Sequence, residues 1–162
     1  MNSIGHWDYQ FGADVRVWIS DDFWLAWWLF EKVCAKNDIL VTLDPKPVDG
    51  DWNGAGAHTN FSTKAMREQD GDMEIHKAIQ KLEQKHYDHI QVYGNGNERR
   101  LTGMHETCSM NQFRWGVSDR GASIRVPEQV AKDGKGYFED RRPSANMDPY
   151  VCLLYTSPSP RD

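Results

Sequence analysis

Residues 46–63 read KPVDGDWNGAGAHTNFST, a glycine-rich loop that leads into a run typical of a strand. Gly54 and Gly56 lack a Cβ, so the backbone there can come close to a ligand. The next residues, 58–63, are expected to form a strand. Alternation along that strand places three polar side chains on one face, those of His58, Asn60 and Ser62. We therefore expect a ligand-binding loop, although a plain glycine turn before an ordinary polar strand explains these residues about equally well.

Residues 135–146 read KGYFEDRRPSAN, in which Glu139 and Arg141 stand two positions apart. On a strand, the two side chains share a face. A carboxylate beside a guanidinium can hold a metal ion and a substrate carboxylate side by side. Taken alone, the pattern fits an ion-paired surface strand slightly better.

Two further motifs carry polar groups in short loops. Residues 99–107 read RRLTGMHET, where a glycine followed by Glu106 suits a mobile flap that carries an acid or a base. A plain loop is the simpler interpretation. Residues 119–127 read DRGASIRVP and place Arg120 and Arg125 around a predicted strand, which suits phosphate binding or solvated charges. Together the four motifs supply an imidazole, carboxylates, arginines and a glycine loop, the groups used in metal-assisted phosphoryl transfer.

The spacing of apolar residues predicts an α+β domain with a mostly antiparallel sheet. Alternation predicts strands over 8–19, 39–43, 58–63, 90–93 and 122–126. A helix is predicted over 23–36, and its apolar residues on nearly all sides predict deep burial. A second helix, over 72–87, has one apolar face and is expected on the surface. No linker is expected between residues 5 and 150.

Composition limits the class of protein. The 162 residues, with 39% hydrophobic and 27% charged, indicate one globular domain with a core. The net charge of -5, with scattered Lys and Arg, argues against nucleic acid and membrane surfaces as partners. The N-terminus lacks the pattern of a secretory signal. The three cysteines are far apart in the sequence and are expected to be free thiols in a reducing compartment.

The motifs together resemble eukaryotic-type glutamine synthetase. Six strings carry the resemblance in unbroken order from Trp7 to Tyr150: WDYQFG, DPKP, DWNGAGAHTNFSTKAMRE, RRLTGMHET, RGASIRVP and GYFEDRRPSAN. The resemblance implies a catalytic domain of the glutamine synthetase and guanidino-kinase type, a homo-oligomeric ring, and active sites between neighbouring subunits. The implied reaction joins ammonia to L-glutamate through γ-glutamyl phosphate, with ATP as co-substrate and Mg²⁺ or Mn²⁺ as cofactor. The implied location is the cytoplasm, or a plastid.

The resemblance also implies roles for individual residues. The implied metal ligands are Asp8, His58 and Glu139. The implied contacts to glutamate are Trp52, Asn53, Gly54, His58, Arg100, Arg120 and Arg141. The implied contacts to ATP are Asp8, Asn60, Ser62, Arg120, Arg125, Tyr137, Phe138 and Glu139. The implied catalytic residues are Glu106, which would help to deprotonate ammonium, Arg120 and Arg141. Asp8 stands where the family has a glutamate that is one methylene longer.

The resemblance sets the expected domain organisation. Residues 1–151 are expected to be part of a catalytic domain, without the family's N-terminal β-grasp domain and its further glutamate ligands. Residues 152–162, CLLYTSPSPRD, break the pattern and are interpreted as an unstructured, non-native tail read from a sequencing adapter. The chain alone is therefore expected to be inactive. The alternatives are a guanidino-kinase-like phosphotransferase and a non-catalytic fragment that joins oligomers.

Overall fold

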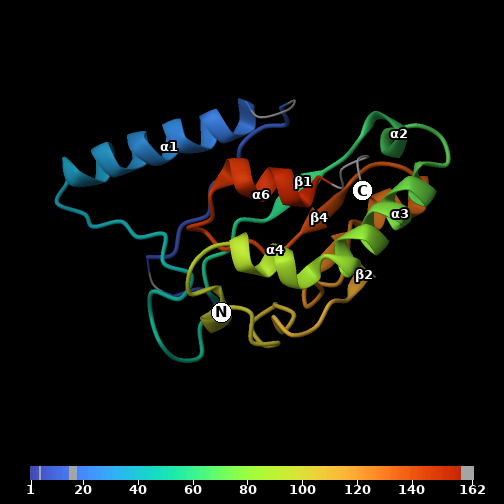
Figure 1. The fold of residues 1–162 in the computed structure, drawn as a ribbon. Coiled ribbons are helices and arrows are strands. Elements are labelled where there is room, and N and C mark those ends of the chain that lie inside the picture. Colours follow the sequence, from blue (N-terminus) through green and yellow to red (C-terminus); the bar gives the residue numbers. More distant parts are fainter. Residues whose placement is uncertain (4, 15–17, 158–162) are drawn as a thin grey trace.

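The computed structural model describes residues 1–3, 5–14 and 18–157 (Figure 1). Within them, one sheet has the strand order β1-β4-β3-β2. The strands are β1 (Thr59–Phe61), β2 (Trp115–Val117), β3 (Ile124–Val126) and β4 (Phe138–Asp140). The pairs β1–β4 and β4–β3 are antiparallel, whereas β2 and β3 run parallel. The fold is α+β as expected, but the sheet is mixed.

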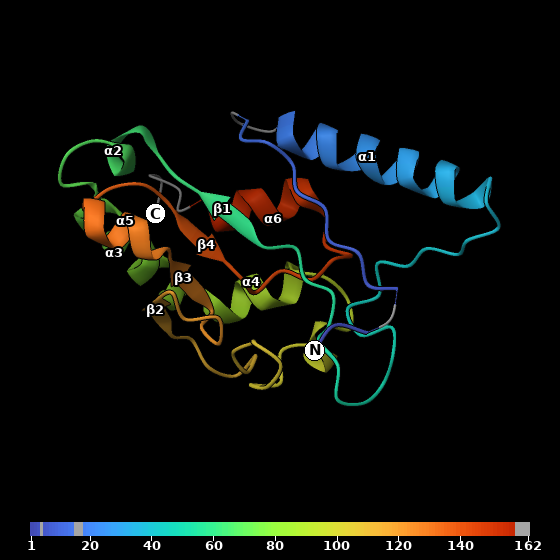
Figure 2. The same cartoon turned by 180° about the vertical axis from the view of Figure 1, so that it is seen from behind.

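Helices α3 (Gly71–Gln84) and α4 (His86–Val92) lie along one face of the sheet, in front of it in Figure 1 and behind it in Figure 2. The apolar face of α3 is buried with β3 and β4, which confirms the predicted amphipathic helix. Its buried side chains include Ile75, Ile79 and Leu82. Three shorter elements complete this part of the fold: α2 (Lys64–Arg67), η1 (Asn97–Arg99) and α5 (Glu128–Asp133).

The strand predicted over 90–93 is wrong, because these residues continue a helix. Alternation over four residues is weak, and helical spacing places His86, His89 and Tyr93 on one buried face of α4 and its C-cap. The side chain of Tyr93 joins a second core cluster with Phe23, Met147 and Cys152.

Helix α6 (Pro149–Thr156) differs from the expectation of an unstructured tail from residue 152 onward. The side chain of Asp148 caps its first turn by accepting hydrogen bonds from the backbone N–H groups of Tyr150 and Val151. Cys152 and Thr156 are both fully buried. The remainder of the expected tail, residues 158–162, lies outside the described residues.

Helix α1 (Trp18–Ala35) runs beside α6, at the edge of the molecule (Figures 1 and 2). The predicted burial is wrong: much of its apolar surface is exposed, including Trp24, Leu25, Trp28 and Val33. An all-round apolar helix is buried only when other elements cover it on every side. Here it packs against α6 and against Tyr9 and Phe11 of the preceding segment.

Two strands predicted beside α1 are also wrong within the described residues. Residues 8–14 and 39–43 have no regular secondary structure, and residues 15–17 of the first prediction lie outside the described residues. A strand needs a hydrogen-bonded neighbour. No described strand pairs with either segment.

Candidate functional site

The glycine loop is fixed to the segment that follows β4. Backbone hydrogen bonds join Ala57 N to Pro143 O at 3.0 Å and Ala145 N to Ala55 O at 3.1 Å. Immediately afterwards, β1 pairs with β4, and Asn60 stands opposite Glu139. These two connections bring the residues after the loop against the residues of KGYFEDRRPSAN.

Arg100 fills the space under the glycine loop. Its Nη2 donates hydrogen bonds to the backbone carbonyls of Arg141, Arg142 and Pro143 at 3.1, 2.6 and 2.9 Å. A Cβ on Gly54 would come within 2.5 Å of the Arg100 side chain. Burial lowers the pKa of Arg100 to about 10, with the charge of Arg141 adding to the effect. In this structure, the glycine allows the loop to pack against an arginine that holds the backbone.

Glu139 is the centre of a charged cluster. Its Oε1 lies 3.0 Å from Nδ1 of His58 and accepts a 3.1 Å hydrogen bond from Nη1 of Arg141. Its Oε2 lies 2.5 Å from Nε of Arg125, which stands opposite it in the β3–β4 pair. Burial raises the pKa of Glu139, but the hydrogen bond and charge of His58 and the charges of Arg141 and Arg125 outweigh this and lower it. The carboxylate is therefore ionised and paired at neutral pH.

Arg141 connects this cluster to two loops. Its Nε donates to the carbonyl of Arg120 at 3.2 Å, and its Nη2 donates to the carbonyl of Glu106 at 3.2 Å. The Arg120 guanidinium in turn donates to Oε1 of Glu106 at 3.2 Å. His105 and Glu106 have φ values of 54° and 62°, so the predicted flap holds two consecutive residues in the left-handed region. Glu106 is thus held at the edge of the cluster through both its carbonyl and its carboxylate.

The donor set suits a divalent cation in part. Nδ1 of His58 and Oε1 of Glu139 face each other at 3.0 Å, so an ion bound by both side chains would take the place of this contact. Asp8 does not join them: it is exposed and lies 3.5 Å from His6. Its predicted strand is not formed. Across the described part of the chain, no group of three or more His, Cys, Asp and Glu side chains is placed to hold a metal.

The other predicted binding residues are more dispersed. The Asn53 side chain contacts Met1 and Asn2, and the hydroxyl of Ser62 accepts a 2.8 Å hydrogen bond from Arg67. The Phe138 side chain is fully buried in the core, so only its backbone could reach a nucleotide. Trp52 and Gly54 lie in the loop, and Asn60 and Tyr137 are exposed on and beside the sheet. The glycine loop also contacts the flap, because Oδ1 of Asp51 lies 3.5 Å from Nε2 of His105.

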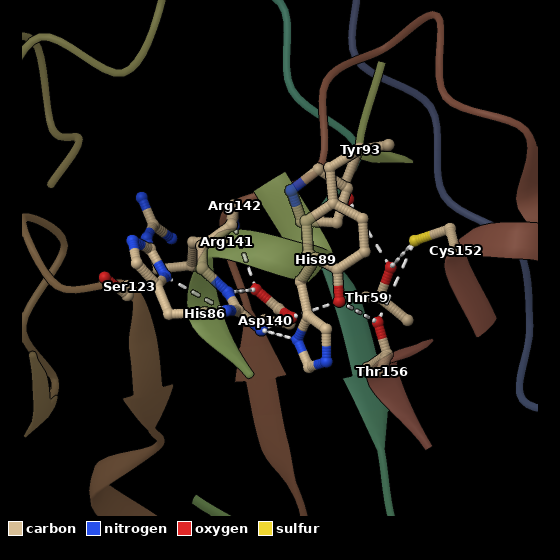
Figure 3. A network of polar contacts seen from close by, with 12 residues as sticks. Thr59, His86, His89, Tyr93, Ser123, Asp140, Arg141, Arg142, Cys152 and Thr156 are labelled. Atoms are coloured by element: carbon tan, nitrogen blue, oxygen red, sulfur yellow. Dashed lines mark hydrogen bonds and ion pairs between the residues drawn. The ribbon is translucent and has the colours of Figure 1, made fainter. Parts of the chain in front are cut away.

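Sequence analysis missed a buried polar network behind β4, shown in Figure 3. Arg142 donates from Nε and Nη2 to the two carboxylate oxygens of Asp140 at 2.9 and 2.7 Å. Its Nη1 lies 3.2 Å from Nδ1 of His86, and its Nη2 lies 3.1 Å from Nδ1 of His89. Asp140 also accepts a 3.0 Å hydrogen bond from the hydroxyl of Tyr93. We refer to these five residues as the rear network.

Comparison with known proteins shows which proteins these residues are similar to. The glutamine synthetase cytosolic isozyme of Pinus sylvestris is 54% identical over 147 residues, which cover 91% of this chain and 41% of the relative. Cytosolic isozyme 1-2 of Oryza sativa subsp. japonica is 58% identical, and the nodule isozyme of Medicago sativa is 57% identical, over the same shares.

Over these residues the chain is similar to proteins named glutamine synthetase. It spans about 41% of the length of the curated glutamine synthetases that it matches. No family model matches the chain. Several of the matched glutamine synthetases are named as cytosolic isozymes. None of the helices in the described residues is both long and apolar enough to cross a membrane.

The rear network predicts a loss of stability in acid. Arg142 can only donate, so both histidines must accept through a neutral Nδ1. Burial and the charge of Arg142 lower the pKa of His89 to about 4, and burial first of all also lowers that of His86. The unfolded chain binds these protons near pH 6.5. The stabilisation is therefore complete above about pH 6.5 and is lost as the pH falls toward about 4.

We expect the contribution of His89 to the free energy of unfolding to fall by about 1 kcal/mol between about pH 7 and about pH 5. This value is reduced because solvent partly screens the ring. Urea unfolding followed by circular dichroism at several pH values measures it. His89→Gln, which keeps a neutral acceptor, should flatten the pH dependence, whereas His76→Gln on the exposed side of α3 should leave it unchanged. If the free energy of unfolding changes with pH equally in His89→Gln and in the unsubstituted chain, the account is contradicted.

Proposed function

We propose that this chain supplies the catalytic region of a glutamine synthetase, which joins ammonia to L-glutamate with hydrolysis of ATP to ADP and phosphate. The observation that carries the proposal is the cluster around Glu139. A buried carboxylate there is surrounded by His58, Arg125 and Arg141, and Arg141 joins it to the flap residue Glu106. The homology to enzymes named glutamine synthetase supports the same reaction.

In the first step, the γ-carboxylate of glutamate attacks the γ-phosphorus of ATP, and ADP leaves. The developing charge on the transferred phosphoryl group is stabilised by guanidinium groups. Three arginines converge on the cluster for this purpose: Arg120, Arg125 and Arg141. Arg141 can present a planar pair of donors to the glutamate carboxylate or its phosphorylated form. Arg100 would act through the backbone of residues 141–143, which it holds.

In the second step, ammonia attacks the carbonyl carbon of γ-glutamyl phosphate, and phosphate leaves. Glu106 is the group that would take a proton from ammonium. Its carboxylate is half exposed and is held by Arg120, so it can face solvent and substrate together. The two left-handed residues of the flap fix this carboxylate at the mouth of the cluster.

A Mg²⁺ or Mn²⁺ ion would be held by the imidazole of His58 and the carboxylate of Glu139, in place of their direct 3.0 Å contact, with Asp8, which lies apart from them, assigned as a third, weaker ligand. A bound cation would neutralise the phosphate oxygens of ATP. Two ligands fill only part of an octahedral shell, so phosphate oxygens, water and groups from elsewhere in the protein complete it. Arg125 must then share Oε2 of Glu139 with the cation.

The remaining assignments belong to the same proposal. The loop residues Trp52, Asn53 and Gly54 bind substrate glutamate, and ATP lies against β1 and the start of β4. The contacts to ATP are Asn60, Ser62, Tyr137 and the backbone of Phe138. Residues 1–151 are the catalytic-domain part, and residues 152–162 are of non-native origin. The assembled protein is a homo-oligomeric ring in the cytoplasm or a plastid, and the exposed aromatic side of α1 is consistent with cover by other parts of it.

His58→Ala tests the proposed metal site. A chimera is made in which the 147 matching residues replace the corresponding stretch of the Pinus sylvestris enzyme, hereafter the pine chimera. The substitution should raise the Mn²⁺ concentration for half-maximal synthetase activity by about tenfold or more, because one metal-binding group is lost. The control is His76→Ala, which lies on α3 away from the cluster. A Mn²⁺ titration that does not move would remove His58 from the metal site.

A further inference from the structure

The strand β4 and the residue after it present two different sets of charged side chains. Glu139 and Arg141 contact each other on the side of the proposed site, and Arg141 also contacts the flap. Asp140 and Arg142 alternate with them and point the opposite way, into the rear network between α4 and α6 (Figure 3). Each residue of the proposed site on this segment is therefore adjacent to a residue of the rear network.

The rear network fixes the backbone on both sides of Arg141. Besides its two side-chain bonds to Asp140, Arg142 donates its backbone N–H to Oδ1 of the same carboxylate at 3.0 Å. The loop closed in this way contains Arg141. The Tyr93 hydroxyl links Asp140 to Thr156 of α6, with 3.0 Å bonds on either side. Asp140 is 0% and Arg142 is 1% exposed, so a loss of either partner leaves an uncompensated buried charge.

With the two histidines, four of the five guanidinium N–H donors of Arg142 have partners. Asp140 accepts from Nε and Nη2 of Arg142, His86 accepts from Nη1, and His89 accepts from Nη2. His86 has its proton on Nε2, which donates to the carbonyl of Met110 at 2.8 Å. The guanidinium also stacks over the rings of Tyr93 and Phe113 at 5.2 and 5.3 Å. Lysine has one ammonium group in place of this planar fork and cannot reproduce the set.

We propose that Asp140 and Arg142, with His86 and His89 as neutral acceptors, are positioning residues for the site, because they fix the backbone from which Glu139 and Arg141 project. This inference rests on the proposed function only for the identity of the ligands that Glu139 and Arg141 bind. Protonation of a histidine would place a second positive charge against Arg142 and release this support. The charged and titratable groups that face the two rings are Arg142, Asp140, Asp88, Tyr87, Tyr93 and Tyr155.

The test follows the Nε–H of Arg141, which donates to the carbonyl of Arg120 at 3.2 Å. In the full 162-residue chain labelled uniformly with ¹⁵N, nuclear magnetic resonance measures its hydrogen exchange together with that of the backbone amides. Arg142→Lys should speed this exchange by about tenfold or more while the amides of α3 stay protected, because the loss is local. The matched control is Arg114→Lys, which alters an exposed pair with Asp119. Unchanged exchange at Arg141 in folded Arg142→Lys would overturn the proposal, as would an equal loss of protection in α3.

If Arg142→Lys does not fold, His89→Gln decides the question. At about pH 4, where His89 with its pKa of about 4 is protonated in half of the folded molecules, the unsubstituted chain should lose protection at Arg141, and His89→Gln, which cannot be protonated, should retain it. Equal loss in both would contradict the proposal. A Mn²⁺ titration of the same samples tests the proposed metal site separately from the positioning role of the rear network. Failure of the unsubstituted chain to bind Mn²⁺ would count against the proposed metal site, whereas the Arg141 signal would still decide the positioning role.

Discussion

Arg142→Met is expected to lower the free energy of unfolding by about 3–5 kcal/mol, the range found when one partner of a buried ion pair is removed. The reason is that Asp140 stays buried and charged while the hydroxyl of Tyr93 gives it only one remaining side-chain donor in place of three. A domain of this size is stable by about 5–15 kcal/mol, so the variant should be close to unfolding at room temperature. Urea unfolding at neutral pH measures the change.

Two further variants test whether the loss comes from the unpaired buried charge. Arg114→Met breaks an exposed pair with Asp119 and should cost less than about 1 kcal/mol. The double variant Asp140→Leu with Arg142→Met removes both buried charges and should recover part of the loss. If Arg142→Met and Arg114→Met cost the same, the rear network does not hold the fold together in the way described.

Arg141→Lys is expected to lower kcat/KM for glutamate about 100- to 1000-fold in the pine chimera, comparable to the loss of a key donor to transition-state charge. Lysine keeps the charge but lacks the fork with which Arg141 contacts Glu139, Arg120 and Glu106 together. Steady-state synthesis of γ-glutamyl hydroxamate with varied glutamate measures the effect.

Arg114→Lys provides the matched control and should stay within about threefold of the unsubstituted chimera, because an exposed pair contributes little. Kinetics of Arg141→Lys equal to those of this control would show that Arg141 is structural and does not grip substrate.

The parts of the site that depend on local spacing could be predicted from the sequence. Two-residue periodicity placed Glu139 and Arg141 together, and they form a 3.1 Å ion pair. The approach of His58 to Glu139 depends on the antiparallel pairing of β1 with β4, which joins segments about eighty positions apart. Local patterns cannot specify such a pairing, so this contact came only from the resemblance to a family.

The rear network was not predicted because it lies on the face of β4 opposite the Glu139 and Arg141 pair. The same periodicity that unites Glu139 and Arg141 sends Asp140 and Arg142 to the opposite face, where a core requires charges to be paired. A partner could have been sought among polar residues on the buried face of a helix. The spacing of His86, His89 and Tyr93 is that signal, and it was obscured when 90–93 was interpreted as a strand.

The predictions that failed most clearly concern residues that need neighbours. Segments 8–14 and 39–43 have the alternation of strands, yet no described strand lies beside them to complete a ladder. Helix α1 has the composition of a buried helix, and its exposed fraction at Trp28 is 52%. Sequence pattern reports what an element could bury, whereas burial depends on which other elements are present.

The central claim is that these residues form the catalytic region of a glutamine synthetase. It is tested most directly by measuring ATP-dependent formation of γ-glutamyl hydroxamate from glutamate and hydroxylamine, with Mn²⁺, in the pine chimera and in the 162-residue chain alone. The account predicts turnover in the chimera and none in the chain alone, which groups only two of the metal-binding side chains. A folded chimera that makes no hydroxamate, or that phosphorylates arginine or creatine instead, would contradict it.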